Sequence, residues 1–258
     1  MRPYLVAAWS SGRRALAARG PLAIRMLFYV VILGVLIALW KAATDANGGT
    51  VSGYDFAAIV WYLVGAEACV IAVDPRMIER IGTEIGTGDI TTEMLRPISV
   101  AGLRMAATFG EVTARFACAI VIGGAFAWFQ VGPPPHGGAA IVAIGSGLLA
   151  LGCNLAAQHT FSAMAFWLRD SKASWFLYQK LVFLLGGMLL PLEMFPDWLQ
   201  RVAWLVPFWT MSYGPARLLS GHPEPMLIVG QLLWLPVLVA IALAAFARGE
   251  RRLEAVGG

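Results

Sequence analysis

Six apolar stretches, each long enough to cross a membrane, constrain this 258-residue chain more than any other feature. A membrane-spanning helix needs about 20 mostly apolar residues. Hydrophobic residues make up 59% of the chain and charged residues 13%, whereas soluble domains have roughly 45–50% and 25%. The sequence therefore predicts one all-α integral membrane domain over 1–258. Its six transmembrane helices are expected at 21–40, 55–73, 105–131, 138–168, 173–192 and 225–247.

The segment before the first span predicts a helix that lies in the membrane surface. Within residues 1–20, Leu5, Ala8, Trp9 and Leu16 can share one helical face, while arginines stay on the polar side. Interfacial helices have this pattern. A disordered basic tail is the alternative.

Residues 74–104 form a long polar segment between the second and third spans, with nine charged side chains. Such a block cannot lie in hydrocarbon, so we expect it in water or against another protein. Asp74 and Pro75 are typical of a helix start, and four aliphatic residues follow at helical spacing (Met77, Ile78, Ile81 and Ile85). Gly86 and Gly88 interrupt this helix. Asp89 can cap a second short helix that Pro97 ends.

The basic residues predict the orientation of the chain. With both termini in the cytoplasm, fifteen of the 19 lysines and arginines lie on that side, and only Lys41, Arg201 and Arg217 lie outside. Positive residues concentrate in cytoplasmic segments, so we expect both ends and residues 74–104 in the cytoplasm. Sixteen arginines against three lysines indicate a GC-rich genome, and hence the cytoplasmic membrane of a bacterium.

Residues 193–221, on the predicted outer side, are rich in prolines and aromatic residues but too interrupted for a span. Asp197 can start a short helix that runs to Leu205. We expect short re-entrant helices that enter the outer leaflet, where protein must cover their free backbone groups. An interfacial aromatic belt is expected from Trp198, Trp204, Trp209 and Tyr213.

The order of these segments resembles that of type-2 ABC exporter permeases, the ABC-2 superfamily. Residues 88–98 (GDITTEMLRPI) are also similar to a motif of small six-span bacterial members, roughly G-x-L-x-x-x-L-L-R/K-P. Gly88, Ile90, Met94, Leu95, Arg96 and Pro97 match that motif, whereas Thr91 and Glu93 depart from the acidic and aliphatic residues common there. The likeness of the segment order covers nearly the whole chain.

The resemblance implies that residues 74–104 are a coupling element that docks on separate ATP-binding cassette ATPase subunits. In such an element Ile90, Met94 and Leu95 are apolar anchors, and Asp89, Glu93 and Arg96 form a polar rim. It also implies a second permease copy or paralogue, with a route lined mainly by spans one, two and five. ATP and Mg²⁺ would belong to the ATPase, because no G-x-x-x-x-G-K-[ST] motif is present. A solvated loop is the alternative for residues 74–104.

Three polar residues within the spans are candidates for a substrate path in an exporter of hydrophobic or amphiphilic molecules. Glu67 lies in the second span, where a charge is costly and indicates function. Asn154 and Gln158 are four residues apart on the fourth span, a spacing that also suits helix–helix hydrogen bonds. Glu111 and Arg115 are expected to form an ion pair near the cytoplasmic surface.

Other functions remain open from the sequence. Glu67 would suit a proton-coupled secondary transporter. Ser146 and His159 are the residues available to an intramembrane protease, and Asp89 with Glu93 to a metal-dependent lipid transferase. We expect Cys69, Cys118 and Cys153 to be small core residues, and we expect neither a bound metal nor a nucleic-acid partner.

Overall fold

The computed structural model of the protein describes residues 2–90, 99–168 and 171–257, and most of them are helical. Two short strands, β1 (Thr50–Val51) and β2 (Tyr54–Asp55), pair antiparallel. The helices are α1 (Arg2–Ala17), α2 (Arg19–Ala46), α3 (Phe56–Ala72), α4 (Met77–Thr87), α6 (Val100–Val131), α7 (Gly137–Ala163), α8 (Ser171–Leu185), α9 (Asp197–Leu205), α10 (Tyr213–Leu219) and α11 (Pro225–Gly257). Three 3₁₀ helices join them: η1 (Met164–Phe166), η2 (Leu192–Met194) and η3 (Pro207–Met211).

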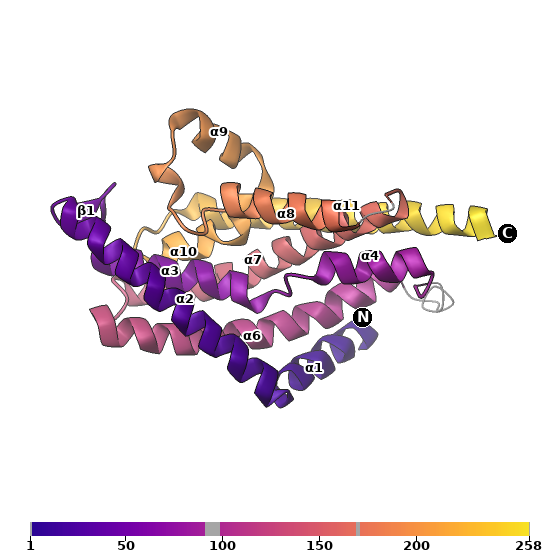
Figure 1. Ribbon diagram of the computed structural model, residues 1–258, viewed down its shortest axis with the longest axis horizontal. Helices are drawn as coiled ribbons and strands as arrows, with labels where there is room; N and C mark the ends of the chain where they lie inside the picture. The colour runs from indigo at the N-terminus through magenta and orange to yellow at the C-terminus, as the bar shows by residue number, and fades with distance from the viewer. Residues whose placement is uncertain (1, 91–98, 169–170, 258) are drawn as a thin grey trace.

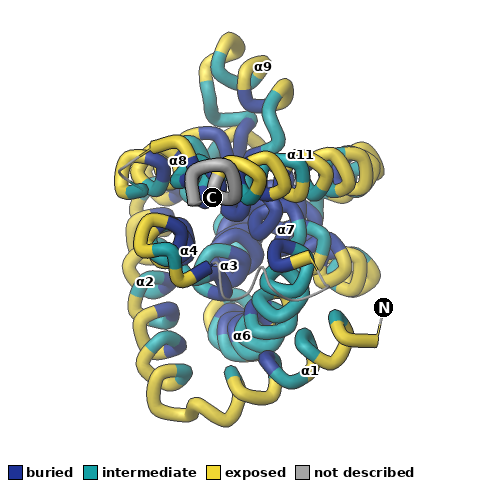
Figure 2. The backbone as a smooth tube through the Cα atoms, turned by 90° about the vertical axis from the view of Figure 1, so that its right-hand side faces the viewer, coloured by how far each residue is buried: buried dark blue, intermediate teal, exposed yellow. Residues whose placement is uncertain are grey.

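Helix α3 is the centre of the bundle. Thirteen of its 17 residues are buried, and α2, α6, α7 and α10 pack around it. Asp55 begins the helix, because its carboxylate accepts a hydrogen bond from the backbone N–H of Ala58 at 2.7 Å. Figure 2 shows this buried centre enclosed by helices whose outer sides are exposed. A helix buried all round is expected to be apolar on every face, which explains why the run 56–72 contains a single charged residue, Glu67.

Five helical segments of the described chain are long and apolar enough to cross a membrane. They are Arg19–Ala46, Phe56–Thr87, Val100–Val131, Gly137–Phe166 and Pro225–Arg252. Each overlaps one of the predicted spans, so the predicted multi-pass helical architecture is confirmed for these five. Several of the helices continue beyond the predicted apolar limits. For example, α6 starts at Val100, because Ser99 caps it by accepting from the N–H of Gly102 at 3.2 Å.

The predicted span over 173–192 differs from the other five. Helix α8 has only 15 residues, about 22 Å of helix, which is shorter than a hydrocarbon core of ~30 Å. It ends because Gly186 and Gly187 leave the helical path, with Gly187 at φ +64°. Their carbonyl oxygens accept hydrogen bonds from Ser212 Oγ, at 2.6 Å, and from the Tyr62 hydroxyl. The sixth crossing therefore stays a prediction.

Helix α1 occupies most of the predicted interfacial segment. One side packs closely on α6, where a Cβ added to Gly110 would overlap the carbonyl group of Ala8. On the other side Leu5, Val6 and Trp9 are exposed. Figure 1 shows α1 meeting α2 at an angle, beside α6. The exposed apolar side is compatible with a helix in the membrane surface, which remains an expectation.

The predicted re-entrant segment folds into η2, α9, η3 and α10. Six of the seven residues of α10 are buried, and the backbone of Ala216 lies so close to α3 that only a glycine fits at position 65. The expectation of an aromatic belt is wrong for two of its members, since Trp209 and Tyr213 are buried inside the protein. Trp198 is exposed on α9, as expected.

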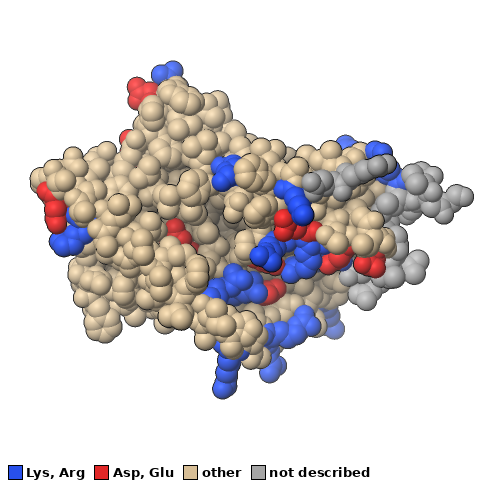
Figure 3. Space-filling model, in the orientation of Figure 1, with Lys and Arg blue, Asp and Glu red and all other residues tan. Residues whose placement is uncertain are grey.

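The charged residues are unevenly distributed along the length of the molecule. On the face shown in Figure 3 they gather mainly at the end where α1 and α4 lie, and most of the remaining surface is uncharged. Both termini lie toward this α4 end, opposite the β1–β2 hairpin (Figure 1). Residues 77–87 and both termini therefore lie toward one end of the bundle, and their position in the cytoplasm stays a prediction.

Candidate functional site

A cavity of about 690 Å³ lies between α2, α3, α7 and α8. Drug-sized ligands occupy pockets of this volume. The cavity brings together Glu67, Asn154 and Gln158, the three residues predicted to line a substrate path. Its other walls are largely apolar and include Phe28, Ile32, Val70, Ile71, Val182, Phe183 and Met188. Figures 1 and 2 show α2 and α8 flanking α3 on one side of the molecule.

The polar groups of the cavity come from all four helices. Asn154 and Gln158 are one turn apart on α7, and Gln158 Nε2 donates to Asn154 Oδ1 at 3.1 Å. The Tyr178 hydroxyl of α8 donates to the same oxygen at 2.9 Å. Asn154 therefore has the helix–helix hydrogen bond that its position suggested. Tyr178 could not be recognised in the sequence, since a tyrosine in an apolar run also suits contact with lipid.

Glu67 enters this cavity from α3. The residue is 4% exposed, and its Oε1 atom has no hydrogen-bond partner within the part of the chain that the structure describes. Gln158 is also 4% exposed, and its Oε1 atom likewise lacks a partner there. A buried carboxylate oxygen without a partner is costly, so Glu67 is a candidate for a role other than packing.

Two side chains close the cavity at the α4 end. Arg25 of α2 donates through Nη1 to the carbonyl oxygens of Ile71 and Val73, at 2.7 and 3.0 Å. The last carbonyls of a helix have no partner within it, so the guanidinium caps α3. On α8, Trp175 Nε1 donates to the carbonyl of Pro75, just before α4. The cavity wall is therefore bonded directly to the start of the polar segment.

Helix α4 packs its predicted apolar face inward against α7, η1 and α8. Met77, Ile78, Ile81 and Ile85 are all buried. Gly82 packs against Ser171, where a Cβ would overlap the serine side chain. Arg104 of α6 forms an ion pair with Glu84 at 2.5 Å, so the end of the polar segment is joined to α4.

The predicted docking residues are only partly described. Helix α4 ends at Thr87, with Gly88 in the left-handed conformation at φ +80°. Asp89 is exposed and accepts from Thr87 Oγ1 at 2.7 Å. Ile90 is fully buried within this chain, which does not fit a direct anchor on a partner surface in this conformation. Glu93, Met94, Leu95 and Arg96, and with them the predicted second helix, lie outside the described residues.

A second polar cluster lies toward the β1 end and ties the re-entrant segment to β2. Glu193 forms an ion pair with Arg217 and accepts from the hydroxyls of Tyr213 and Tyr54, at 2.8 and 3.3 Å. Arg217 also pairs with Glu224 at 3.5 Å. Burial, followed by the nearby Glu193 carboxylate, raises the pKa of Tyr54 above its usual value near 10. The phenol therefore stays protonated and keeps donating.

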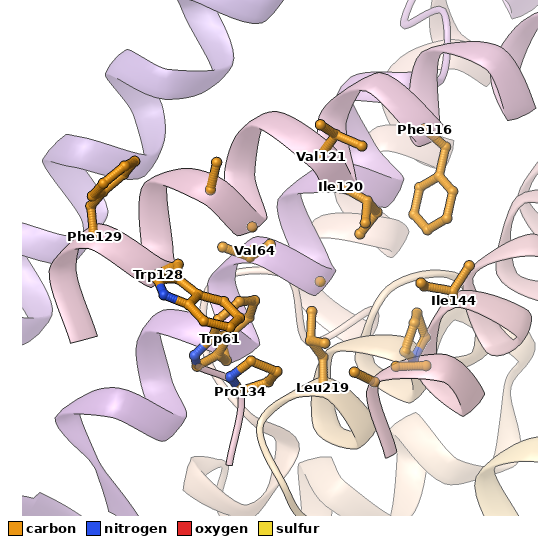
Figure 4. Close-up of a pocket in the computed structure, with 16 residues that line it drawn as sticks. Trp61, Val64, Phe116, Ile120, Val121, Trp128, Phe129, Pro134, Ile144 and Leu219 are labelled. Carbon is orange, nitrogen blue, oxygen red and sulfur yellow. The ribbon is translucent and has the colours of Figure 1, made fainter. Parts of the chain in front are cut away.

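A second cavity, of about 500 Å³, is shown in Figure 4. It lies between α3, α6, α7 and α10, with Trp61 and Trp128 close to Pro134, and Phe116 and Ile144 near its other end. All of its 16 lining residues are apolar or glycine. It offers no carboxylate or amide to select a ligand, so the first cavity is the stronger candidate for specific recognition.

The two residues of the protease hypothesis do not converge, and Glu93 of the transferase hypothesis lies outside the described residues. Ser146 and His159 are thirteen residues apart on α7, about 20 Å along the helix, too far to act on one bond. Ser146 Oγ instead donates to Gln231 Oε1 at 2.7 Å. Glu111 and Arg115 form the predicted ion pair. Among the described residues no group of three His, Cys, Asp or Glu side chains could hold a metal ion.

Comparison with known families gives a match over most of the chain. The family described as "ABC-2 family transporter protein" matches residues 28–257. The matched range contains the first cavity except for Pro21, Ile24 and Arg25, and it includes α4 and the whole re-entrant segment. A search of curated proteins finds no match to this chain.

Proposed function

The chain belongs to the ABC-2 family of transporter proteins, and we propose that it is the permease of an exporter driven by a separate ATPase. The substrate is a hydrophobic or amphiphilic molecule that leaves the cytoplasm of a bacterium. The cavity between α2, α3, α7 and α8 carries this proposal, because it joins an apolar wall to the buried polar groups of Glu67, Asn154 and Gln158. Such a combination suits an amphiphilic ligand.

The chain itself contributes the membrane path and not the hydrolysis. ATP and Mg²⁺ bind to the ATPase subunits, and this chain binds no cofactor of its own. A second permease copy or a paralogue completes the path, since α2 and α8, which both line the cavity, carry apolar and exposed side chains (Phe28, Val31, Val35, Phe176, Phe183 and Leu184). Both termini and α4 face the cytoplasm in this arrangement.

The ATPase transmits its conformational change to the permease through the polar segment around α4. A coupling element must be rigid, and α4 is held by its buried aliphatic face and by the Glu84–Arg104 ion pair. Trp175 then links this element to the cavity through its bond to Pro75. Asp89, Glu93 and Arg96 form the polar rim of the docking surface, with Met94 and Leu95 as apolar anchors. Ile90 supports this surface from within the chain.

Charge reversal at Asp89, Glu93 and Arg96 tests the docking surface. We expect the triple variant to insert into the membrane normally and to lose co-purification with the ATPase, because like charges would then face each other. The matched control exchanges the charges of Lys41 and Asp45, an exposed pair at the opposite end of the molecule. Unchanged co-purification of the triple variant would refute the docking role.

A proton-coupled secondary transporter is the second candidate. The buried carboxylate of Glu67 favours it, because its Oε1 atom accepts no hydrogen bond from residues 2–90, 99–168 or 171–257. Such a carrier binds and releases a proton on a buried carboxylate in each cycle. The two candidates differ in their energy source. Transport that continues without an ATPase, and that stops when the proton gradient is removed, would support the carrier.

A further inference from the structure

The hydrogen bonds around the first cavity leave acceptors without donors. Four of its lining donors already have acceptors: Gln158 Nε2, Tyr178 Oη, Trp175 Nε1 and Arg25 Nη1. Within the described residues, no protein group donates to Glu67 Oε1 or to Gln158 Oε1. The amide of Gln179 also lines the cavity but donates to neither oxygen. The lining thus includes an acidic oxygen and an amide oxygen that receive no hydrogen bond from the described residues, and a ligand, a proton or water can satisfy them.

The negative charge of Glu67 indicates which class of ligand the cavity can bind. A buried carboxylate without a partner is strongly unfavourable, and a cation that enters the cavity removes most of that cost. The nearest basic group on the cavity wall, Arg25, donates instead to the carbonyls of Ile71 and Val73, one turn beyond Glu67. An anionic ligand would leave Glu67 without a partner, whereas a positively charged one would neutralise it.

The remaining walls suit the body of such a ligand. Phe28, Phe183 and Trp175 contribute aromatic rings, which attract cations over their faces and also bury apolar groups. Ile32, Val70 and Met188 add aliphatic surface. The cavity therefore combines the acidic group of Glu67 and the Arg25 cation at its α4 end with mostly apolar walls. Because Arg25 donates to backbone carbonyls and not to Glu67, the acidic group still favours an amphiphile with a single positive charge.

We propose that this cavity binds an amphiphilic organic ammonium ion with at least one N–H group. The positive charge lies against the carboxylate of Glu67, an N–H group donates to Gln158 Oε1, and the apolar body packs against Phe28 and Phe183. The proposal rests on the exporter function above and specifies the substrate class of the same site. Quaternary ammonium ions bind less well, because they cannot donate a hydrogen bond to Gln158.

Three radiolabelled probes of one shape test the site on the full chain in lipid nanodiscs. They are 2-(1-naphthyl)ethylammonium, its N,N,N-trimethyl analogue and the neutral 2-(1-naphthyl)ethanol, with protein-free nanodiscs subtracted. We expect the primary ammonium ion to bind roughly ten-fold more tightly than the alcohol, and several-fold more tightly than the trimethyl analogue, because of its charge and its N–H group.

Substitutions in the cavity separate the contribution of the probe's positive charge from that of its N–H group. Glu67→Gln should remove the preference for the ammonium ion over the alcohol, and Glu67→Asp, which keeps the charge, should retain much of it. Gln158→Leu should remove the preference for the primary over the trimethyl ion. The control Asp45→Asn, at an exposed position outside the cavity, should bind all three probes as the native chain does.

Equal binding of the ammonium ion and the alcohol to the native chain would overturn the proposal, as would an unchanged preference in Glu67→Gln. A transport assay distinguishes this failure from failure of the exporter function. If the ammonium ion binds as expected but ATP does not drive its transport, the exporter function is wrong and the site stands. If ATP drives transport of another substrate and no probe binds, the site is wrong and the exporter function stands.

Discussion

At the scale of single residues, Tyr178 joins α8 to the polar groups of the cavity. Its hydroxyl donates to Asn154 Oδ1, which also accepts from Gln158 Nε2. Because the buried oxygen keeps one donor when the other is removed, Tyr178→Phe should destabilise the protein by only about 1 kcal/mol. The thermal unfolding midpoint in nanodiscs measures this loss. Tyr4→Phe, on α1 and away from the cavity, is the control, and an equal loss in both variants would contradict the assignment.

At the scale of helices, Trp175 connects α8 with the start of the α4 segment. Trp175→Phe keeps an aromatic ring in the cavity wall but removes the N–H that donates to the Pro75 carbonyl. We expect substrate binding to be retained, and the stimulation of ATPase activity by substrate to fall roughly five-fold or more, within the usual range of coupling between sites. Parallel binding and ATPase titrations of the reconstituted complex measure both quantities.

Either of two results would contradict this role of Trp175. If binding and stimulation fell together, Trp175 would be a cavity residue without a role in coupling. If neither changed, the bond to Pro75 would be incidental. Trp198→Phe on the exposed side of α9 provides a tryptophan control outside both elements.

The cluster around Glu193 belongs to the same scale, because it holds the re-entrant helices against β2 and α3. Glu193→Gln leaves Arg217 half-buried, with Glu224 as its remaining acidic partner. We expect the free energy of unfolding to fall by about 1–2 kcal/mol. The decrease is this small because both side chains are partly exposed to solvent, which weakens the ion pair. Hydrogen exchange should quicken in α10 and in the residues after α8.

A double-mutant cycle with Arg217→Met separates pairing from packing. The double variant should lose less free energy of unfolding than the two single variants lose together, because neither charge is then left unpaired. Additive losses would show that the two side chains do not interact in the folded protein.

At the scale of the whole molecule, hydropathy predicted the positions of five long helices, because the membrane demands long apolar helices whatever their packing. It could not predict where α8 ends. Residues 173–192 are mostly apolar, but the carbonyls of Gly186 and Gly187 accept hydrogen bonds from Ser212 and Tyr62 in distant parts of the chain. These hydrogen bonds are tertiary contacts, so no local sequence pattern predicts where the helix ends.

The residues of the candidate site were also predicted only in part. Glu67, Asn154 and Gln158 stood out as polar residues in apolar runs, and the structure places them on one cavity. Tyr178, which donates to Asn154, and Trp175, which lines the same cavity, did not stand out, because an aromatic residue in a span suits both lipid and protein contact. The same ambiguity explains the error for Trp209 and Tyr213, which were expected in a belt and are buried.

Reconstitution in proteoliposomes tests the central claim most directly. Vesicles would contain the chain with an ATPase subunit, with a hydrolysis-deficient ATPase, or alone, and transport of 2-(1-naphthyl)ethylammonium would be followed under ATP or under a proton gradient. The account predicts transport only with ATP and the active ATPase. Transport by the chain alone, driven by the proton gradient, would contradict it.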